Sequence, residues 1–510
     1  MMRRCGILLH PTCFPSPQGI GDLGESAYRF IDFLQAAGQS LWQILPLGPP
    51  GYGNSPYQCT SSFAGNPMLI NLQSLVEAGW LSDSDLQTAT RFRRDYVDFE
   101  SVIPCREGLL KKAAASFRRK ANKIERTAFE AFCADKRAWL DSYAKFMARK
   151  EANENVEWVR WRPEVQGSDD DVCTHKFIQF QFFTQWQKLK RYCHQRGIKI
   201  IGDIPIFVAH DSADVWSNPE LFDLGSDGLP NRVAGVPPDY FSATGQLWGN
   251  PLYRWDVHEQ TGYRWWIERV RSTLELVDIV RVDHFRGFEK YYEIPAGASD
   301  AATGRWVEGP GARLFEALQK ALGHLPIIAE DLGLITPEVK ALRDRFGFPG
   351  MRILQFAFAN DSSTDDFKPY NYIRNCVAYT GSHDNDTVAG WFTGSGTGDS
   401  TRTLDEVQQE REFARLYLNS DGREIHWDFI RTLLGSVAET AIIPLQDILG
   451  LGSEARMNLP ASVGRNWAWR YQEGDLKAEI SERLRLMVAA YGRVPHGGSV
   501  GDGGMEGWRD

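Results

Sequence analysis

The sequence predicts an α/β protein, a (β/α)8 or TIM barrel with largely helical and loop-rich insertions between its strands. Eight short apolar runs alternate with stretches of helical periodicity, and this alternation favours a parallel sheet. Carboxylates stand at the ends of three of these runs, at Asp283, Glu330 and Asp384, and in a barrel such strand ends gather at one rim. We expect a single catalytic domain over about residues 1–495 and a Gly-rich, disordered tail over 496–510.

The first elements form a strand, a helix and a second strand. The apolar run Gly6–Leu9 is followed by a helix over about Glu25–Ala37, which Gly38 ends, and then by the strand Ser40–Leu47. Between the first strand and the helix, Gly19–Gly24 superficially matches the dinucleotide-binding pattern GxGxxG. That pattern needs its glycines directly after the strand, and here some ten residues with three prolines intervene, so no nucleotide cofactor is predicted.

Two insertions are predicted between the early strands. The first, about 50–196, starts with the turn-rich loop Gly51–Pro67 and continues with helical periodicity to the third strand. The second, about 210–275, is loop-rich, apart from a helix near Tyr263–Thr273, and its segment Gly235–Trp255 concentrates aromatic rings. Because rings in such segments often stack on sugars, we favour a carbohydrate lid, with a packed irregular loop as the alternative. The rings are those of Tyr240, Phe241, Trp248, Tyr253 and Trp255.

The later strands follow at the spacing of a barrel. The third to eighth predicted strands are Ile198–Val208, Ile279–Val282, Leu325–Glu330, Met351–Phe356, Cys376–Thr380 and Ala441–Gln446.

Composition excludes several classes of protein. The net charge of −9 makes nucleic acid an unsuitable partner, and without an 18-residue apolar stretch no membrane span is expected. The eight cysteines form no CxxC pair and no paired Cys/His spacing, so we predict neither a metal site nor a disulfide framework. Free thiols suit a reducing cytoplasm.

The fourth predicted strand carries the first candidate for catalysis. Arg281 and Asp283 are two residues apart, so on a strand both side chains point the same way. A fixed cation favours the ionised form of a neighbouring carboxylate, as a nucleophile requires, although a structural ion pair is the simpler alternative. In the third strand Asp203 stands within an apolar run, where it needs a partner.

Three strand-end carboxylates together favour retaining glycosyl transfer. In that chemistry one carboxylate attacks the anomeric carbon, and a protonated carboxyl serves as acid and then as base. Asp283 suits the nucleophile. An apolar strand and nearby carboxylates would raise the pKa of Glu330 toward the acid role. Asp384, with His383 beside it, would bind sugar hydroxyls and stabilise the oxocarbenium-like transition state.

Several segments together resemble the 4-α-glucanotransferases of the amylomaltase (disproportionating enzyme) family, which are relatives of the α-amylases. The resemblance implies that Asp283 is the nucleophile, Glu330 the acid/base and Asp384 the stabilising aspartate. The matching segments are Leu8–Thr12, Gly19–Gly24, Ser55–Pro67, Gly202–Val208, Pro237–Trp255, Arg281–Phe288, Ala329–Gly333 and His383–Thr387.

The resemblance also implies substrate-binding residues. Tyr57 would stack near the cleaved bond, Asp239 and Trp248 would lie in a flexible loop over the acceptor side, and Asn458 would lie in a second loop at the cleft. The remaining substrate-binding candidates are Asp203, Arg281 and His383. Ser382 stands where the family usually has Thr. The implied ligands are maltooligosaccharides and α-glucans, with no cofactor and no metal.

We predict a cytoplasmic α-1,4-glucan transferase that passes a glucan segment to a 4-hydroxyl of another sugar, with two alternatives. A transferase passes the covalent glucosyl group to another sugar, whereas an α-amylase-like hydrolase with the same three acids passes it to water. The aromatic segment Gly235–Trp255 favours transfer, because it can bind an acceptor and exclude water. A non-catalytic glucan-binding protein would need neither Asp283 nor a buried Glu330.

Overall fold

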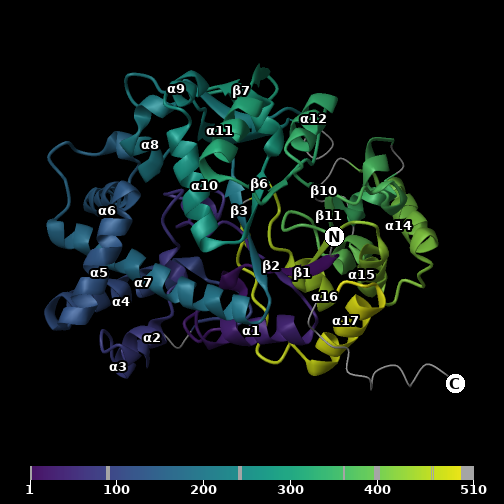
Figure 1. Ribbon diagram of the computed structural model, residues 1–510, viewed down its shortest axis with the longest axis horizontal. Coiled ribbons are helices and arrows are strands. Elements are labelled where there is room, and N and C mark those ends of the chain that lie inside the picture. The colour runs from purple at the N-terminus through teal and green to yellow at the C-terminus, as the bar shows by residue number, and fades with distance from the viewer. Residues whose placement is uncertain are drawn as a thin grey trace.

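A closed barrel of eight parallel strands forms the centre of the protein (Figure 1), which confirms the predicted fold class. The computed structural model describes residues 3–87, 92–238, 244–359, 362–394, 402–460, 462 and 464–494. Around the barrel the strand order is β1-β12-β11-β10-β9-β6-β3-β2. These strands are β1 Arg4–Leu8, β2 Leu41–Gln43, β3 Lys199–Pro205, β6 Ile279–Asp283, β9 Ile327–Ala329, β10 Gly350–Ile353, β11 Cys376–Tyr379 and β12 Thr440–Pro444.

Each of the eight predicted runs overlaps one barrel strand, although the bounds differ by up to a few residues at either end. The run that contains β2 was expected to reach Leu47, whereas the strand ends at Gln43. Ile44 and Leu45 stay buried outside the strand, and Pro46 has no N–H with which to continue a ladder. The apolar run therefore predicted which residues are buried, but not where the hydrogen-bonded strand ends.

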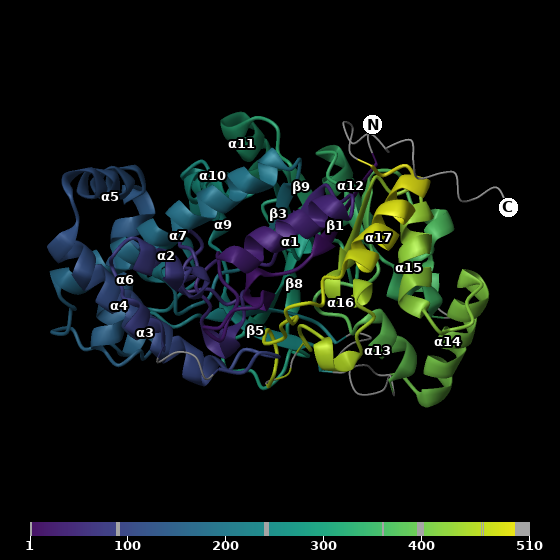
Figure 2. The same cartoon turned by 90° about the horizontal axis from the view of Figure 1, so that it is seen from below.

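Helices surround the barrel and extend from it on two sides (Figures 1 and 2). Among the described residues, no helix is long and apolar enough to cross a bilayer. The α-helices are α1 Glu25–Ala36, α2 Leu72–Glu77, α3 Asp83–Gln87, α4 Phe99–Lys120, α5 Lys123–Asp135, α6 Arg137–Ala152, α7 Asp169–Gln195, α8 Ala213–Ser217, α9 Trp255–Gln260, α10 Arg264–Leu276, α11 Ala312–Leu322, α12 Pro337–Arg345, α13 Val388–Thr393, α14 Leu404–Leu418, α15 Ile425–Gly435, α16 Leu445–Ile448 and α17 Ala478–Ala490.

The insertion between β2 and β3 contains helices α2 to α7 and lies to one side of the barrel, away from α14 and α15 (Figures 1 and 2). It holds the preceding loop, 51–67, in place. The side chain of Gln179 on α7 accepts from Gly65 N at 2.7 Å and donates to Gly65 O at 2.9 Å. A Cβ at position 65 would overlap the Phe182 ring, so glycine is required for this close approach.

A second sheet, antiparallel and in the order β5-β4-β7-β8, was not predicted. Its strands are β4 Arg232–Val236, β5 Gln246–Pro251, β7 Lys290–Pro295 and β8 Arg305–Glu308. The aromatic segment Gly235–Trp255, which we expected to be loop-rich, therefore contains a strand, β5. Tyr253, one of the rings expected in the carbohydrate lid, is buried, and its hydroxyl donates to Ile206 O at 2.8 Å. It packs against Phe207 and Trp266, partners far from it in sequence.

Arg493, near the end of the described chain, binds backbone carbonyls at the N-terminal ends of strands β1 and β12. β1 pairs with both β2 and β12. Arg493 is fully buried at the start of this seam and donates to Arg4 O at 2.9 Å and Glu439 O at 3.3 Å. Three more carbonyls accept from the same guanidinium, those of Leu434, Ser436 and Ala438. The first and last barrel strands are thus joined by a side chain as well as by their ladder.

Candidate active site

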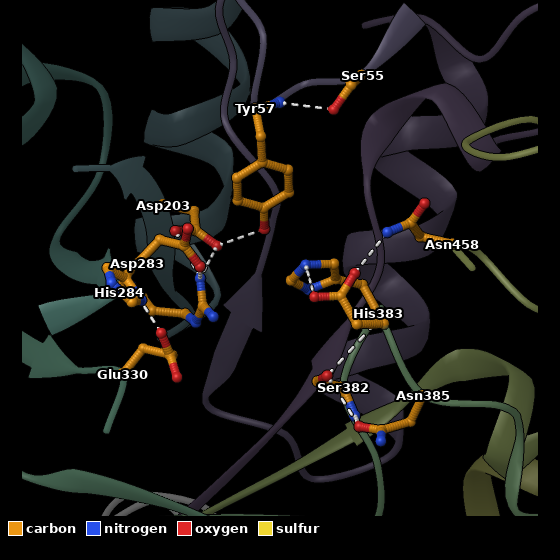
Figure 3. A network of polar contacts seen from close by, with 12 residues as sticks. Ser55, Tyr57, Asp203, Asp283, His284, Glu330, Ser382, His383, Asn385 and Asn458 are labelled. Carbon is orange, nitrogen blue, oxygen red and sulfur yellow. Dashed lines mark hydrogen bonds and ion pairs between the residues drawn. The ribbon is translucent and has the colours of Figure 1, made fainter. Parts of the chain in front are cut away.

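The predicted site residues converge at one rim of the barrel. Asp203 lies within β3, Asp283 ends β6, and Glu330 directly follows β9. His383 and Asp384 come a few residues after β11. In Figure 3, Asp203, Asp283 and Glu330 lie on one side of the Tyr57 ring and His383 on the other.

Arg281 joins two carboxylates at the centre of the site. The register of β3 and β6 sets Asp203 opposite Arg281. The Arg281 Nη1 donates to both oxygens of Asp203, at 2.9 and 2.7 Å, and to Asp283 Oδ1 at 2.9 Å. Burial opposes its charge, but the two carboxylates raise the pKa of Arg281 well above its usual value. Asp203 thus has the partner that its apolar strand required, and the partly exposed Asp283 lies against a permanent cation.

Glu330 is held by two backbone amides. Its Oε2 accepts from His284 N at 2.6 Å and its Oε1 from Leu332 N at 2.8 Å. His284 reaches this position with a left-handed backbone, φ 52°, directly after β6. The Glu330 residue is only 9% exposed. This burial, with the charge of Asp283, raises the pKa of Glu330 to about 7, although Arg281 and the two amides act in the opposite direction.

The opposite side of the site keeps its carboxylate ionised. Asp384 Oδ1 accepts from Asn458 Nδ2 at 2.6 Å, and Oδ2 lies 3.3 Å from His383 Nε2. Burial disfavours the charge, but His383, Asn458 and Arg281 overcome it and hold the pKa of Asp384 at about 2. The side chain of Asp384 is still 45% exposed, so it remains accessible to a ligand.

Tyr57 connects the two sides. Its hydroxyl donates to Asp203 Oδ2 at 2.9 Å, and its ring stacks on His383 with centroids 5.1 Å apart and an interplanar angle of 16°. One small hollow has Tyr57 and Asp203 in its lining, and another has His383 and Asn385. Tyr57 therefore contacts both the Asp203 and the His383 side of the site.

The two loop positions predicted for the acceptor side have different outcomes. Trp248 lies in β5, with its ring 4.9 Å from that of His284 and nearly perpendicular to it, and its Nε1 donates to Gln246 Oε1 at 3.1 Å. The second sheet thus brings Trp248 next to the residue that follows Asp283. Asp239, with Tyr240 and Phe241, lies outside the described residues.

Two functional contacts were missed from the sequence. One is the His284 amide, which no side-chain pattern could indicate. The other is Arg456, which donates to Asn458 O at 2.8 Å and to Asp384 O at 2.6 Å and so fixes the second loop against the site. Its place two residues before Asn458 was the available signal. Among the described residues, no group of three or more His, Cys, Asp or Glu is placed to hold a metal ion.

This geometry can support displacement at an acetal carbon. One carboxyl, Glu330, can carry a proton near neutral pH, while Asp384 is ionised and Asp283 lies beside a buried cation. A proton donor and an anionic nucleophile at one pH are what a retaining double displacement requires.

Comparison with known proteins agrees with this chemistry. A family model described as 4-alpha-glucanotransferase matches residues 9–477. The 4-alpha-glucanotransferase of Synechocystis sp. is 50% identical over 507 residues, covering 96% of this chain and 98% of its own length. That of Thermus thermophilus is 48% identical over 512 residues, covering 96% and 99%.

A solved structure is similar over nearly the whole chain. The amylomaltase from Streptococcus agalactiae in complex with acarbose has a TM-score of 0.90 and 36% identity, covering 97% of this chain and all of that one. The amylomaltase from Corynebacterium glutamicum, at 18% identity and a TM-score of 0.80 over 97% of this chain and 75% of its own, shows the shared fold alone.

Proposed function

The chain belongs to the 4-alpha-glucanotransferase family, and we propose that Asp283, Glu330 and Asp384 carry out its reaction by a retaining, two-step mechanism. As a member, it is a glycosyltransferase that acts on α-glucans. The observation that carries the mechanistic proposal is the Glu330 carboxyl, buried with a pKa of about 7 next to the pair formed by Arg281 and Asp283.

In the first step, a carboxylate oxygen of Asp283 attacks the anomeric carbon of the donor glucan. The bond from that carbon to the leaving oxygen breaks, and Glu330 transfers its proton to this oxygen. In the second step, Glu330, now a carboxylate, takes the proton from the 4-hydroxyl of an acceptor sugar. The acceptor oxygen attacks the same carbon and Asp283 leaves, so the configuration is retained.

The surrounding residues are proposed to bind the sugars. Asp384, ionised and partly exposed, would accept hydroxyl hydrogen bonds and stabilise positive charge in the transition state. Tyr57 would stack on the sugar at the cleaved bond, and its phenol hydroxyl is held by the hydrogen bond to Asp203. The pKa of His383 is raised, despite its burial, by the Asp384 carboxylate, which supports a hydrogen-bond donor at this position.

The acceptor side is proposed to involve Trp248 and Asp239. The contact of the Trp248 ring with His284 supports this for the tryptophan. Transfer, rather than hydrolysis, then depends on a sugar occupying this side in place of water. Maltooligosaccharides are the proposed substrates, supported by the solved amylomaltase complex with acarbose.

Three wider proposals concern the whole chain. We propose one catalytic domain, since barrel and insertion residues share a continuous hydrophobic core. A reducing cytoplasm is supported by the eight cysteines, all of them free thiols. The net charge of −9 supports the absence of a nucleic-acid partner.

Incubation with maltotriose tests the function. A ladder of longer oligosaccharides together with glucose is expected on thin-layer chromatography. Glucose and maltose without longer products would identify a hydrolase, and unchanged maltotriose would identify a binding protein.

A further inference from the structure

The barrel is most weakly paired next to Glu330. β9 and β10 share a single paired position, Ala329 with Gly350. On its other side β9 pairs with β6 at three positions, and β10 pairs with β11 at four. The chain leaves β9 at Glu330, so the backbone that carries this residue has a full ladder on one side and almost none on the other.

The next residue, Asp331, crosses this weak seam with its side chain. Its Oδ1 accepts from Met351 N of β10 at 2.7 Å. Its Oδ2 is paired with Arg343 of α12 and lies 3.5 Å from Nη1 of Arg352 in β10. The side chain is 2% exposed. A buried carboxylate with two guanidinium partners and a backbone donor is a strong, directional link.

Gly350 leaves room for this link. A Cβ at position 350 would lie 2.7 Å from both Asp331 Oδ1 and Arg343 Nη1, and closer still to Oδ2. Real Cβ atoms are essentially never this close to such neighbours, so a side chain at Gly350 would disturb the contact between the Asp331 carboxylate and the Arg343 guanidinium.

The hydrogen bonds of Glu330 run toward β6 and to Leu332 N within its own turn. Its N–H donates to Val282 O and its carbonyl accepts from Phe285 N, both at 3.0 Å. Its carboxylate accepts from His284 N. The counterpart toward β10 is the Asp331 side chain, one residue along the same turn.

We propose that Asp331 is a positioning residue for Glu330: by anchoring the end of β9 to β10 and α12, it sets where the Glu330 carboxyl stands relative to the leaving oxygen. This proposal rests on the acid role proposed above for Glu330. A proton donor must lie within hydrogen-bond reach of the oxygen it protonates, and a displacement of about 1 Å can cost about 100-fold in rate. Asp331 would therefore act on the step that needs a proton.

Two glycosyl-donor substrates, maltotriose and α-glucosyl fluoride, distinguish a positioning role of Asp331 from a general loss of structure. Cleavage of maltotriose needs a proton on the leaving oxygen, whereas α-glucosyl fluoride releases fluoride without one. For each variant, the ratio of first-step rates on the two donors is independent of the fraction of enzyme that is folded. We expect Asp331→Asn to lower the maltotriose rate at least about tenfold more than the fluoride rate, which corresponds to about 1.4 kcal/mol of barrier.

A matched control and a second variant complete the design. Asp344 also pairs with Arg343 but is exposed, so Asp344→Asn should leave the ratio unchanged. Gly350→Ala alters no charge, yet it should displace the Asp331 carboxylate. Like Asp331→Asn, it should therefore lower the maltotriose rate more than the α-glucosyl fluoride rate. This second variant keeps the test valid if Asp331→Asn is too unstable to purify.

Glu330→Gln serves as the reference for the acid role. If this variant loses both rates equally, the proposed role of Glu330 is wrong. If it discriminates between the donors while Asp331→Asn and Gly350→Ala lose both rates equally, or keep both, the role of Glu330 stands and the positioning role of Asp331 is refuted.

Discussion

Glu330 should make the folded protein less stable as the pH rises. Its pKa is about 7 in the folded protein, against an ordinary 4.5, so the folded state holds this proton more tightly than the unfolded state. The stability that the proton confers is complete below about pH 4.5 and is lost as the pH rises through about 7. In Glu330→Gln there is no carboxyl to titrate at this position, so the variant should not lose this part of the stability as the pH rises.

The size of the effect follows from the two pKa values. At 1.36 kcal/mol per pKa unit, a shift from 4.5 to about 7 is worth about 3 kcal/mol in all, and about 2 to 3 kcal/mol of this is lost between pH 5 and pH 8. An unfolding entropy of about 2.1 cal/mol/K per residue, taken over 510 residues, converts this into about 2 °C in Tm. Any constant cost of placing an amide against two backbone N–H groups cancels in the comparison between the two pH values.

Thermal unfolding of wild type and Glu330→Gln at pH 5 and pH 8 measures this difference. The quantity compared is the Tm of Glu330→Gln minus the Tm of wild type. We expect this difference to be about 2 °C larger at pH 8 than at pH 5. Glu308→Gln, at an exposed strand end, controls for the removal of a surface carboxylate. The same Tm difference between Glu330→Gln and wild type at both pH values would refute the view that burial holds a proton on Glu330.

Three further variants test other parts of the site. Asp283→Asn should keep the fold but retain less than about a tenth of wild-type kcat, at least about 1.4 kcal/mol of barrier, because an amide cannot attack the anomeric carbon; a higher kcat would reject the nucleophile. Trp248→Ala should raise the acceptor KM and shift products toward hydrolysis, and an unchanged ratio of transfer to hydrolysis would assign the ring to packing. Asn458→Ala removes a hydrogen bond to the Asp384 carboxylate, whose pKa of about 2 should then rise, so kcat should begin to fall at a higher pH on the acid side. An acid limb that coincides with that of wild type would exclude this role of Asn458.

The barrel could be predicted because its strands are locally encoded. Each strand is a short apolar run, and its position between helical segments needs no knowledge of distant contacts. The pairing of Arg281 with Asp283 was similarly accessible, since two residues on one strand two positions apart share a side. The raised pKa of Glu330 also followed from its sequence surroundings, an apolar run with carboxylates at neighbouring strand ends.

The second sheet and the seam at β9 could not be predicted in this way. β5 is part of an antiparallel sheet, and its Pro and Gly content gave the appearance of a loop. Tyr253 is buried by partners such as Trp266, which only the folded chain brings to it. Asp331 directly follows Glu330 in the sequence, but its partners Arg343 and Arg352 are on a later helix and strand, and no periodicity connects them.

The seam between β1 and β12 has a consequence for synthesis of the chain. More than 400 residues separate Arg4 from its partner Thr440, so at about 5–20 residues per second the ribosome needs roughly 20–90 s to produce β12 after β1. Until then one edge of β1 has no partner, and the Arg493 guanidinium that bridges both strand starts has not been made. An unpaired strand edge is a template for association with other chains. Heterologous expression should therefore yield more native protein when growth is cooler or when chaperones that bind extended segments are abundant.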